Sequence, residues 1–358
     1  MKKNILVVDD SALMRRIICD IINSDEQFQA TEICHDGLEA YELLQKKSFD
    51  AVILDVNMPR MDGLELLERL RQEQIEATVV MVSSLTVDGA SVTLRAMELG
   101  AVDFVKKPEN LIEAKGSRFH DKLLMILNSV VFSKGKKKES TASQQVLTTA
   151  RIKRTPQRSR VLTHGANRLI ALACSTGGPK SLQSVLPLLK ANLDAPMVLV
   201  QHMPAGFTKS LAERLNELSE ITVKEAQEGD VLKKGTVYIA PGGKHLEVLA
   251  DLNGVHRLHL NDSEPVGGLK PCANITFQSL IQSKFDEIVC VVLTGMGADG
   301  TKGITELAEK KPVYVIAQDE ESSVVYGMPR AIAEAGMVDE VVPLEQVARA
   351  INNKVGVK

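Results

Sequence analysis

The sequence lacks the features that mark membrane, secreted and metal-thiolate proteins. No apolar run approaches the ~20 residues of a membrane-spanning helix. The five cysteines are scattered and include no Cys-x-x-Cys pair, which argues against structural zinc and against a disulfide framework. The N-terminus enters a short apolar strand without the hydrophobic region or cleavage site of a signal peptide. We therefore expect a cytoplasmic protein with reduced thiols and no membrane insertion.

A net positive charge is confined to one segment. Residues 133–160 carry nine basic groups and one acidic group, whereas the sequence on either side is net acidic and the whole chain carries −3. Neither acidic part shows the basic face and reading motif of a nucleic-acid binder, so we expect no nucleic-acid partner. High charge and low apolar content predict that residues 129–164 form a basic flexible linker. Docking of this segment against the acidic parts is the alternative.

The length of 358 residues exceeds the size at which one hydrophobic core keeps growing, so two domains are expected. We place them at residues 1–128 and 165–352. Both alternate buried apolar strands with helices, which predicts two α/β domains with doubly wound parallel sheets. The turn at Asn253-Gly254 adds an antiparallel hairpin to the second domain. Strands are expected near residues 5–9, 31–34, 51–55, 78–83, 103–106, 168–173, 196–201, 236–240, 288–294 and 312–317.

Polar side chains follow successive strands of the first domain. Asp9 and Asp10 follow one buried strand, Asp55 another, and Ser83 and Lys107 two more. The carboxyl ends of parallel strands share one edge of a sheet, so these groups are expected to converge. Carboxylates suit Mg²⁺, and one of them can act as a nucleophile that takes up a phosphoryl group. A hydroxyl and an ammonium can hold the other phosphoryl oxygens.

The first 125 residues resemble a response-regulator receiver domain. The motifs that carry the resemblance are Val8-Asp9-Asp10-Ser11, Asp55-Val56-Asn57-Met58-Pro59, Met61-Asp62-Gly63, Val82-Ser83-Ser84 and Lys107-Pro108. The resemblance implies a flavodoxin-like fold, Asp55 as phosphoacceptor and a histidine kinase as phosphodonor. It implies that Ser83 and Lys107 contact the phosphoryl group and that Phe104 is a switching aromatic. The implied Mg²⁺ ligands are Asp9, Asp10, Asp55 and the backbone carbonyl of Asn57.

A candidate nucleophile opens the second domain. Ser175 follows a predicted buried strand, and Gly177 and Gly178 precede a helix, so their backbone N–H groups can form part of an oxyanion hole. One alternative is that Ser175 is an ordinary helix N-cap. Another is that the neighbouring Cys174 is the nucleophile, although strand alternation would point its side chain away from that of Ser175.

A serine nucleophile requires a base and an orienting carboxylate. His202 ends the strand near 196–201 at the same expected edge, and His245, after Pro241-Gly242-Gly243, is its main rival. Asp299 lies in a glycine-rich loop that also follows a buried strand. Three strands would then supply Ser, His and Asp in one place, which is the set used in acyl transfer.

Residues 165–350 resemble the catalytic domain of the chemotaxis protein-glutamate methylesterases, the CheB family. The matching segments are Ser175-Thr176-Gly177-Gly178-Pro179, His202-Met203-Pro204, Ala240-Pro241-Gly242-Gly243, Leu293-Thr294-Gly295-Met296-Gly297-Ala298-Asp299-Gly300 and Tyr326-Gly327-Met328-Pro329. The resemblance implies a triad of Ser175, His202 and Asp299, with Thr176 and Met296 beside it and no cofactor in this domain. The implied substrates are methyl-esterified glutamates of methyl-accepting chemotaxis receptors and, in many members, receptor glutamines.

Two positions depart from the family pattern. Asn57 stands where a glutamate is frequent, which affects the expected lifetime of the phosphoryl group. Pro271-Cys272-Ala273-Asn274 replaces a segment that usually reads Pro-Ser-x-Asp, which leaves substrate preference open.

The resulting hypothesis is a monomeric enzyme controlled by a phosphorylation switch. The first domain would cover the cleft of the second until Asp55 is phosphorylated. A phosphorylation-gated scaffold without catalysis is the alternative. A transcriptional regulator is excluded, because residues 161–358 show no helix-turn-helix pattern and are net acidic.

Overall fold

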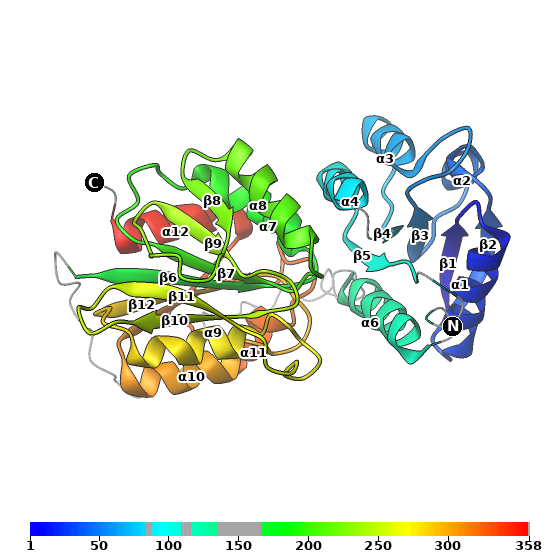
Figure 1. Ribbon diagram of the computed structural model, residues 1–358. Helices are drawn as coiled ribbons and strands as arrows, with labels where there is room; N and C mark the ends of the chain where they lie inside the picture. Colours follow the sequence, from blue (N-terminus) through cyan, green and yellow to red (C-terminus); the bar gives the residue numbers. More distant parts are fainter. Residues whose placement is uncertain (84–86, 109, 111–112, 114–115, 135–165, 357–358) are drawn as a thin grey trace, which may run out of the picture. The chain divides into compact units, whose positions relative to one another are not determined.

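The computed structural model in Figure 1 describes residues 1–83, 87–108, 110, 113, 116–134 and 166–356. The chain divides into two compact units, Met1–Thr141 and Ala142–Lys358, and each is described by itself. Helix α6 (Ser117–Lys134) continues through residues 129–134, where we placed the start of the linker. The rest of that predicted linker lies outside the described residues. No helix of the described chain is long and apolar enough to cross a membrane.

The first unit is built on a five-stranded parallel sheet with the order β2-β1-β3-β4-β5. The strands are β1 (Lys3–Val8), β2 (Phe28–Cys34), β3 (Ala51–Asp55), β4 (Val79–Ser83) and β5 (Asp103–Lys106). Strands β3 and β4 are buried along their whole length, because helices cover both faces of the sheet. The order reverses between β1 and β3, so their carboxyl ends form a switch point where ligands bind in such folds.

Helices pack on both faces of this sheet (Figure 1). Helices α2, α3 and α4 form a row on one face, and α1 packs beside α6 on the other. Asp62 caps α3 through a capping box with Glu65, and Asp36 caps α2. The bounds are α1 (Ala12–Ser24), α2 (Gly37–Leu44), α3 (Gly63–Gln72) and α4 (Val87–Leu99). This arrangement confirms the α/β sheet predicted for the first domain.

The second unit contains a seven-stranded sheet with the order β14-β13-β12-β6-β7-β9-β8, in which every neighbouring pair is parallel. Its strands are β6 (Arg168–Cys174), β7 (Met197–Gln201), β8 (Thr222–Glu225), β9 (Thr236–Ile239), β12 (Glu287–Val292), β13 (Val313–Gln318) and β14 (Glu340–Val342). Strands β6 and β7 are fully buried at the centre. The predicted second α/β sheet is therefore confirmed.

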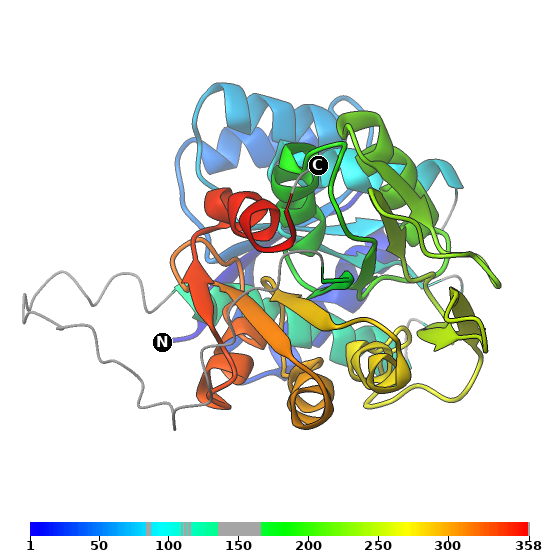
Figure 2. The same cartoon turned by 90° about the vertical axis from the view of Figure 1, so that its left-hand side faces the viewer.

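Helices also cover both faces of the second sheet, as Figure 2 shows. One layer holds α7 (Gly178–Val185), α8 (Phe207–Leu218), α12 (Leu344–Val355) and the short 3₁₀ helix η2 (Leu186–Leu188). The other holds α9 (Ala273–Ser279), α10 (Thr301–Lys310), α11 (Met328–Glu334) and the 3₁₀ helix η3 (Leu280–Gln282).

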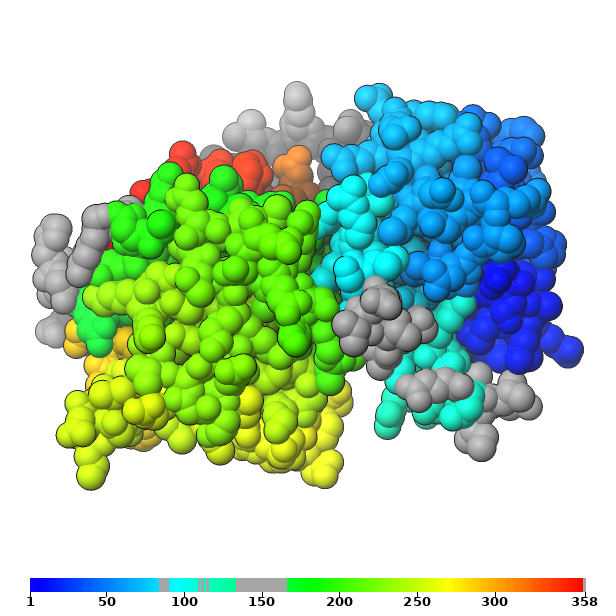
Figure 3. Space-filling view, turned by 45° about the horizontal axis from the view of Figure 1, so that its top comes forward, coloured from blue at the N-terminus to red at the C-terminus, as the bar shows by residue number. Residues whose placement is uncertain are grey.

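The expected antiparallel hairpin is present and packs on the second unit. Strands β10 (His245–Ala250) and β11 (His256–Asn261) pair with each other and share a buried cluster with α9 and the main sheet. Leu246, Val248 and Leu258 supply the hairpin's part of this cluster. Figure 3 shows the chain from α8 into the hairpin, in green to yellow, forming much of one face of the second unit.

Candidate functional site

The structure brings together the three predicted carboxylates of the first unit. Single oxygen atoms of Asp9, Asp10 and Asp55 all lie within 4.8 Å of one another, with Asp9 and Asp55 buried and Asp10 exposed. Lys107 joins them, with its Nζ 2.6 Å from Asp55 Oδ2 and 2.9 Å from Asp9 Oδ2. This site lies at the switch point between β1 and β3, as predicted.

The donor set fits a hard cation. Within the described chain, Asp9 Oδ2 is buried and is satisfied by the ammonium of Lys107 at 2.9 Å. A buried carboxylate is stabilised by a cation, and a divalent ion would share this role with Lys107. Burial raises the pKa of Asp55 to about 6 and Asp9 adds to this, while Lys107 opposes it. A divalent ion at this acidic cluster would offset the same repulsion between carboxylates.

The other predicted residues of this site lie in β4, β5 and the loop after β3. Ser83 ends β4 and accepts a hydrogen bond from Thr93 Oγ1 at 2.8 Å. Phe104 is buried in β5 opposite Met81. Asn57 is exposed in the loop after β3. That loop returns close to Asp55, since a Cβ on Gly63 would lie 2.3 Å from the Asp55 carbonyl oxygen.

In the second unit, the turn after β6 presents Ser175. Its backbone N–H donates to the Thr294 carbonyl at 3.0 Å, and its carbonyl accepts from Gly178 N–H at 2.7 Å. Helix α7 has Gly177 as its N-cap, with φ +77° and no side-chain cap, so Ser175 does not serve as the cap. The alternative of a capping serine is therefore excluded. Within the described chain, the Ser175 hydroxyl makes no hydrogen bond.

Cys174 is not available as a rival nucleophile. It is fully buried, and its Sγ donates to Gln201 Oε1 at 3.0 Å. Burial raises the pKa of its thiol, which keeps it protonated. A nucleophilic cysteine requires the opposite shift.

The predicted base and carboxylate pair directly. His202 Nε2 lies 2.8 Å from Asp299 Oδ2, and both side chains are almost completely buried. An ionised carboxylate accepts, so this contact selects the imidazole tautomer with its proton on Nε2. Nδ1 is then the basic nitrogen, the reverse of the nitrogen order in the best-known serine proteases. Neither Nδ1 nor Ser175 Oγ is hydrogen-bonded to any residue that the structure describes, so no hydrogen bond yet closes the triad.

Asp299 sits in a dense set of donors. Its oxygens accept from the backbone N–H groups of Ala273 at 2.6 Å, Gly300 at 2.9 Å and Asn274 at 3.0 Å. Burial alone would raise its pKa, but the His202 hydrogen bond, the His202 charge and the backbone donors outweigh it and lower the pKa to about 2. Asp299 is therefore ionised throughout the physiological range.

The rival histidine, His245, has a different task. It is fully buried, its Nδ1 accepts from the Cys272 N–H at 3.2 Å, and its Nε2 lies 3.2 Å from the Glu264 carbonyl oxygen. Both ring nitrogens are thus engaged, and neither can take a proton from a serine. The ring instead fixes the segment that donates to Asp299.

Two positioning residues were not identified from the sequence. Gln201 Nε2 donates to the carbonyl oxygens of Ser175 at 3.1 Å and His202 at 3.3 Å, so one buried amide holds both backbone segments. Thr294 Oγ1 donates to the Thr176 carbonyl at 3.0 Å. Only the position of Gln201 at the end of a buried strand next to His202 could have suggested such a role.

The predicted oxyanion region surrounds Ser175. Thr176, Gly177 and Gly178 are buried in the turn, and Met296 is half-buried in the loop after β12. That loop approaches the serine closely, because a Cβ on Gly295 would lie 2.8 Å from Ser175 Cβ. Backbone N–H groups at such a turn suit a developing oxyanion.

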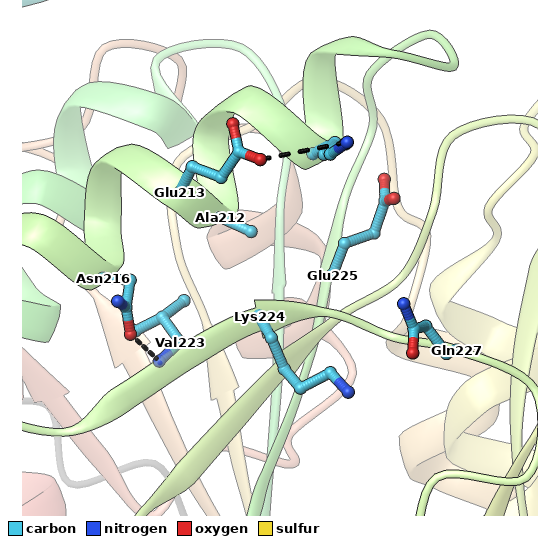
Figure 4. Close-up of a pocket in the computed structure, with 8 residues that line it drawn as sticks. Ala212, Glu213, Asn216, Val223, Lys224, Glu225 and Gln227 are labelled. Atoms are coloured by element: carbon cyan, nitrogen blue, oxygen red, sulfur yellow. Dashed lines mark hydrogen bonds and ion pairs between the residues drawn. The ribbon is translucent and has the colours of Figure 1, made fainter.

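A separate groove lies between α8 and β8 (Figure 4). Lys209 and Glu213 pair along α8 at 4.0 Å, Lys224 pairs with Asp230 at 2.9 Å, and Asn216 Oδ1 accepts from Val223 N–H at 2.9 Å. It contains none of the predicted catalytic residues. The lining residues are Lys209, Ala212, Glu213, Asn216, Val223, Lys224, Glu225 and Gln227.

Comparison with known proteins identifies the family of each unit. Residues 170–351 match the model of the CheB methylesterase family, and residues 5–115 match that of the response regulator receiver domain. A protein-glutamate methylesterase/protein-glutamine glutaminase of Syntrophomonas wolfei is 40% identical over 353 residues, 98% of each chain. The chain belongs to the CheB methylesterase family.

Further members of the CheB family give the same result. A protein with the same name from Pyrococcus horikoshii is 41% identical over 98% of this chain and 93% of its own. The crystal structure of the Thermotoga maritima CheB methylesterase catalytic domain is 41% identical, with a TM-score of 0.50. It covers 52% of this chain and 98% of the solved chain.

The departure at Asn274 from the CheB pattern has a structural explanation. Asn274 Oδ1 accepts from the N–H groups of Gly303 at 2.7 Å and Gly300 at 3.1 Å, so it caps the start of α10 from a neighbouring helix. Its backbone N–H meanwhile donates to Asp299. An asparagine oxygen accepts these bonds as an aspartate would. The side chain is thus committed to the loop that carries Asp299.

Proposed function

We propose that this protein is a phosphorylation-controlled serine hydrolase that removes methyl groups from glutamate side chains of chemotaxis receptors and deamidates receptor glutamines. The His202–Asp299 pair beside the uncommitted hydroxyl of Ser175 is the observation that carries the proposal. The names of the full-length relatives support the same substrates. The triad assignment is Ser175 as nucleophile, His202 as base and Asp299 as orienting carboxylate.

The reaction follows a two-step acyl transfer. His202 Nδ1 takes the proton of Ser175 Oγ, which attacks the carbonyl carbon of the side-chain ester or amide. Backbone N–H groups of Thr176 and Gly177 stabilise the oxyanion, with Met296 beside them, whereas the predicted Gly178 donor is already bonded to the Ser175 carbonyl. His202 then protonates the leaving methanol or ammonia, and water hydrolyses the acyl-enzyme by the reverse proton path. Asp299 stabilises the imidazolium throughout, because it is ionised and buried next to the ring.

The receiver unit supplies the control. Asp9, Asp10 and Asp55 with the Asn57 carbonyl would hold Mg²⁺, whose chemistry is to offset the charge of an incoming phosphoryl group. Asp55 accepts the phosphoryl group from a histidine kinase, and Ser83 and Lys107 contact its oxygens. Phe104, the switching aromatic, responds to the phosphorylation of Asp55. The receiver then no longer covers the catalytic cleft. The protein acts as a cytoplasmic monomer.

The test is methanol release from methylated receptor membranes, with and without Mg²⁺ and a small phosphodonor. We expect release that rises with phosphodonor and disappears in Ser175→Ala. Release absent from both proteins, with Asp55 still phosphorylated, would favour the scaffold alternative. Ammonia release from receptors that carry glutamine, without methanol release from methylated ones, would restrict the activity to deamidation.

A further inference from the structure

A buried thiol touches the carboxylate of the triad without taking part in the reaction described above. Cys272 immediately precedes α9 and is 1% exposed. Its Sγ lies 3.2 Å from Asp299 Oδ1, on the carboxylate oxygen opposite the one that faces His202.

The other donors to Asp299 come from the backbone. Ala273, Asn274 and Gly300 donate backbone N–H groups, which only a substitution by proline would remove. Within the described chain, His202 and Cys272 are the two side chains that donate to this carboxylate. The residue type at position 272 therefore determines how strongly a side chain offsets the charge of Asp299. The charge that is not offset acts on His202.

The thiol must act as the donor in this contact. An ionised carboxylate only accepts, and a thiolate at this position would repel it. Burial and the neighbouring Asp299 raise the pKa of Cys272 to about 11, so the thiol keeps its proton. The titratable groups around this contact are His202 and Asp299 on one side and His245, which accepts from the Cys272 N–H, on the other.

We propose that Cys272 is a positioning residue, whose S–H donates to Asp299 and thereby sets how readily His202 takes up a proton. The proposal rests on the triad function proposed above. A thiol is a weaker donor than a hydroxyl, so it leaves more negative charge on the carboxylate than a serine would. The presence of cysteine at this position thus leaves more of the Asp299 charge facing His202 than serine would.

Three variants separate this role from simple packing. Cys272→Ala removes the S–H donor and also side-chain volume, whereas Cys272→Val removes the donor without loss of volume. Cys272→Ser retains a donor. We expect the Ala and Val variants to lose about three- to tenfold in kcat/KM, with KM little changed. Because Asp299 then carries more uncompensated charge, the acid limb of the kcat/KM profile should move to higher pH by about half a unit.

In the conservative variant Cys272→Ser, the acid limb of the kcat/KM profile should not move to higher pH. Cys272→Ser should keep activity within about threefold of the unaltered protein, with the acid limb unchanged or at slightly lower pH. Equal profiles for the Ser and Val variants, or an acid limb in Cys272→Ala that coincides with that of the unaltered protein, would overturn the proposal. Melting temperature is measured in parallel, because a purely structural role would change it without moving the acid limb.

Infrared spectroscopy provides a readout that does not depend on catalysis. The S–H stretch of Cys272, isolated as the difference between the full-length protein and Cys272→Ser, should lie at the low frequency of a strongly hydrogen-bonded thiol. It should shift upward in Asp299→Ala. A band at the frequency of a free thiol would overturn the proposal. If the unaltered protein releases no methanol, the proposed function is rejected. The frequency of the S–H band would still show whether Cys272 donates a hydrogen bond to Asp299.

Discussion

At the scale of single residues, the catalytic unit depends on one buried amide. Gln201 uses both N–H groups on the carbonyls of Ser175 and His202, and its oxygen accepts from Cys174. The proposed nucleophile and base follow different strands, so their separation is set by backbone positions that this amide holds. Neither residue could move independently without breaking one of these bonds.

Replacement of Gln201 by methionine tests this role. The side chain keeps a similar length but loses both donors, which leaves the His202 carbonyl oxygen without its partner and the Ser175 carbonyl with the Gly178 N–H alone. We expect kcat to fall about tenfold or more, because an unsatisfied buried group costs about 1–3 kcal/mol and the triad loses its spacing. The measurement is methanol release at saturating substrate. Leu199→Met, a similar change on the same strand, serves as the control, and equal losses in both variants would contradict the prediction.

Asp299 also makes the stability of the catalytic unit depend on pH in the acid range. Its pKa of about 2 lies below the ordinary value of 3.8, so its ionised form stabilises the fold. This contribution, about 2 kcal/mol, is present above pH ~4 and is lost as the pH falls through the range 4 to 2.

Thermal unfolding of the unaltered protein and Asp299→Asn, measured by calorimetry over this range, checks the expectation. The Asn variant has no carboxylate to protonate, so the difference in melting temperature should narrow as the pH falls. A difference that stays constant from pH 5 to pH 2 would show that the carboxylate charge adds nothing to stability.

The sequence was most informative about residues at strand ends. The placement of Asp9, Asp10, Asp55 and Lys107 in one cluster was predicted, because parallel strands end at one edge. The pairing of His202 with Asp299 followed from the same rule. The roles of Gln201, Cys272 and His245 could not be predicted, since they depend on which side chain reaches across to a neighbouring loop, and strand periodicity carries no such information.

At the scale of elements, the start of helix α10 is capped from outside. The residue before it, Gly300, has φ +92° and no side chain, so Asn274 of α9 supplies the acceptor for two of the free N–H groups. The same helix start carries Asp299. Capping and catalysis therefore share one loop, and a change in one is expected to affect the other.

Asn274→Ala removes this cap. We expect a loss of about 1 kcal/mol in the stability of the catalytic unit, a fall of about 2–4 °C in its melting temperature. Asn274→Asp retains the acceptor and adds a negative charge at a helix N-terminus, so it should be neutral or stabilising. Calorimetry of the full chain measures both. An Asp variant as unstable as the Ala variant would argue that the side-chain oxygen is not the cap.

Short edge strands were the elements that sequence patterns did not predict. Strands β8 and β14 contain four and three residues, lie at the two edges of the second sheet, and mix exposed with buried positions. The central strands were predicted because burial on both faces requires continuous apolar runs. An edge strand is held by one neighbour only, so its sequence carries a weak signal.

At the scale of the whole molecule, two chemically independent sites lie on one chain. The proposed phosphoacceptor cluster belongs to the unit Met1–Thr141 and the proposed triad to the unit Ala142–Lys358. A signal at Asp55 can alter catalysis only if phosphorylation changes how strongly one unit associates with the other.

Asp55→Ala separates basal from switched activity. It removes the phosphoacceptor and leaves the triad intact, so basal methanol release should remain while the rise with phosphodonor is lost. The assay compares initial rates with and without phosphodonor in the presence of Mg²⁺. Glu26→Ala, a change of an exposed carboxylate on the same unit, is the matched control and should respond normally. Activation of Asp55→Ala equal to that of the control would reject the switch.

The order of strands in the second sheet has a consequence for biosynthesis. Ser175, His202 and Asp299 follow β6, β7 and β12, which are neighbours in space although β12 is made last. The central position of β12 must therefore stay open until most of the unit has left the ribosome. Because Asp299 follows β12 in sequence, a nascent or prematurely terminated chain that ends before it would carry the serine and the histidine without their carboxylate. Incomplete products of translation would thus be silent toward receptors.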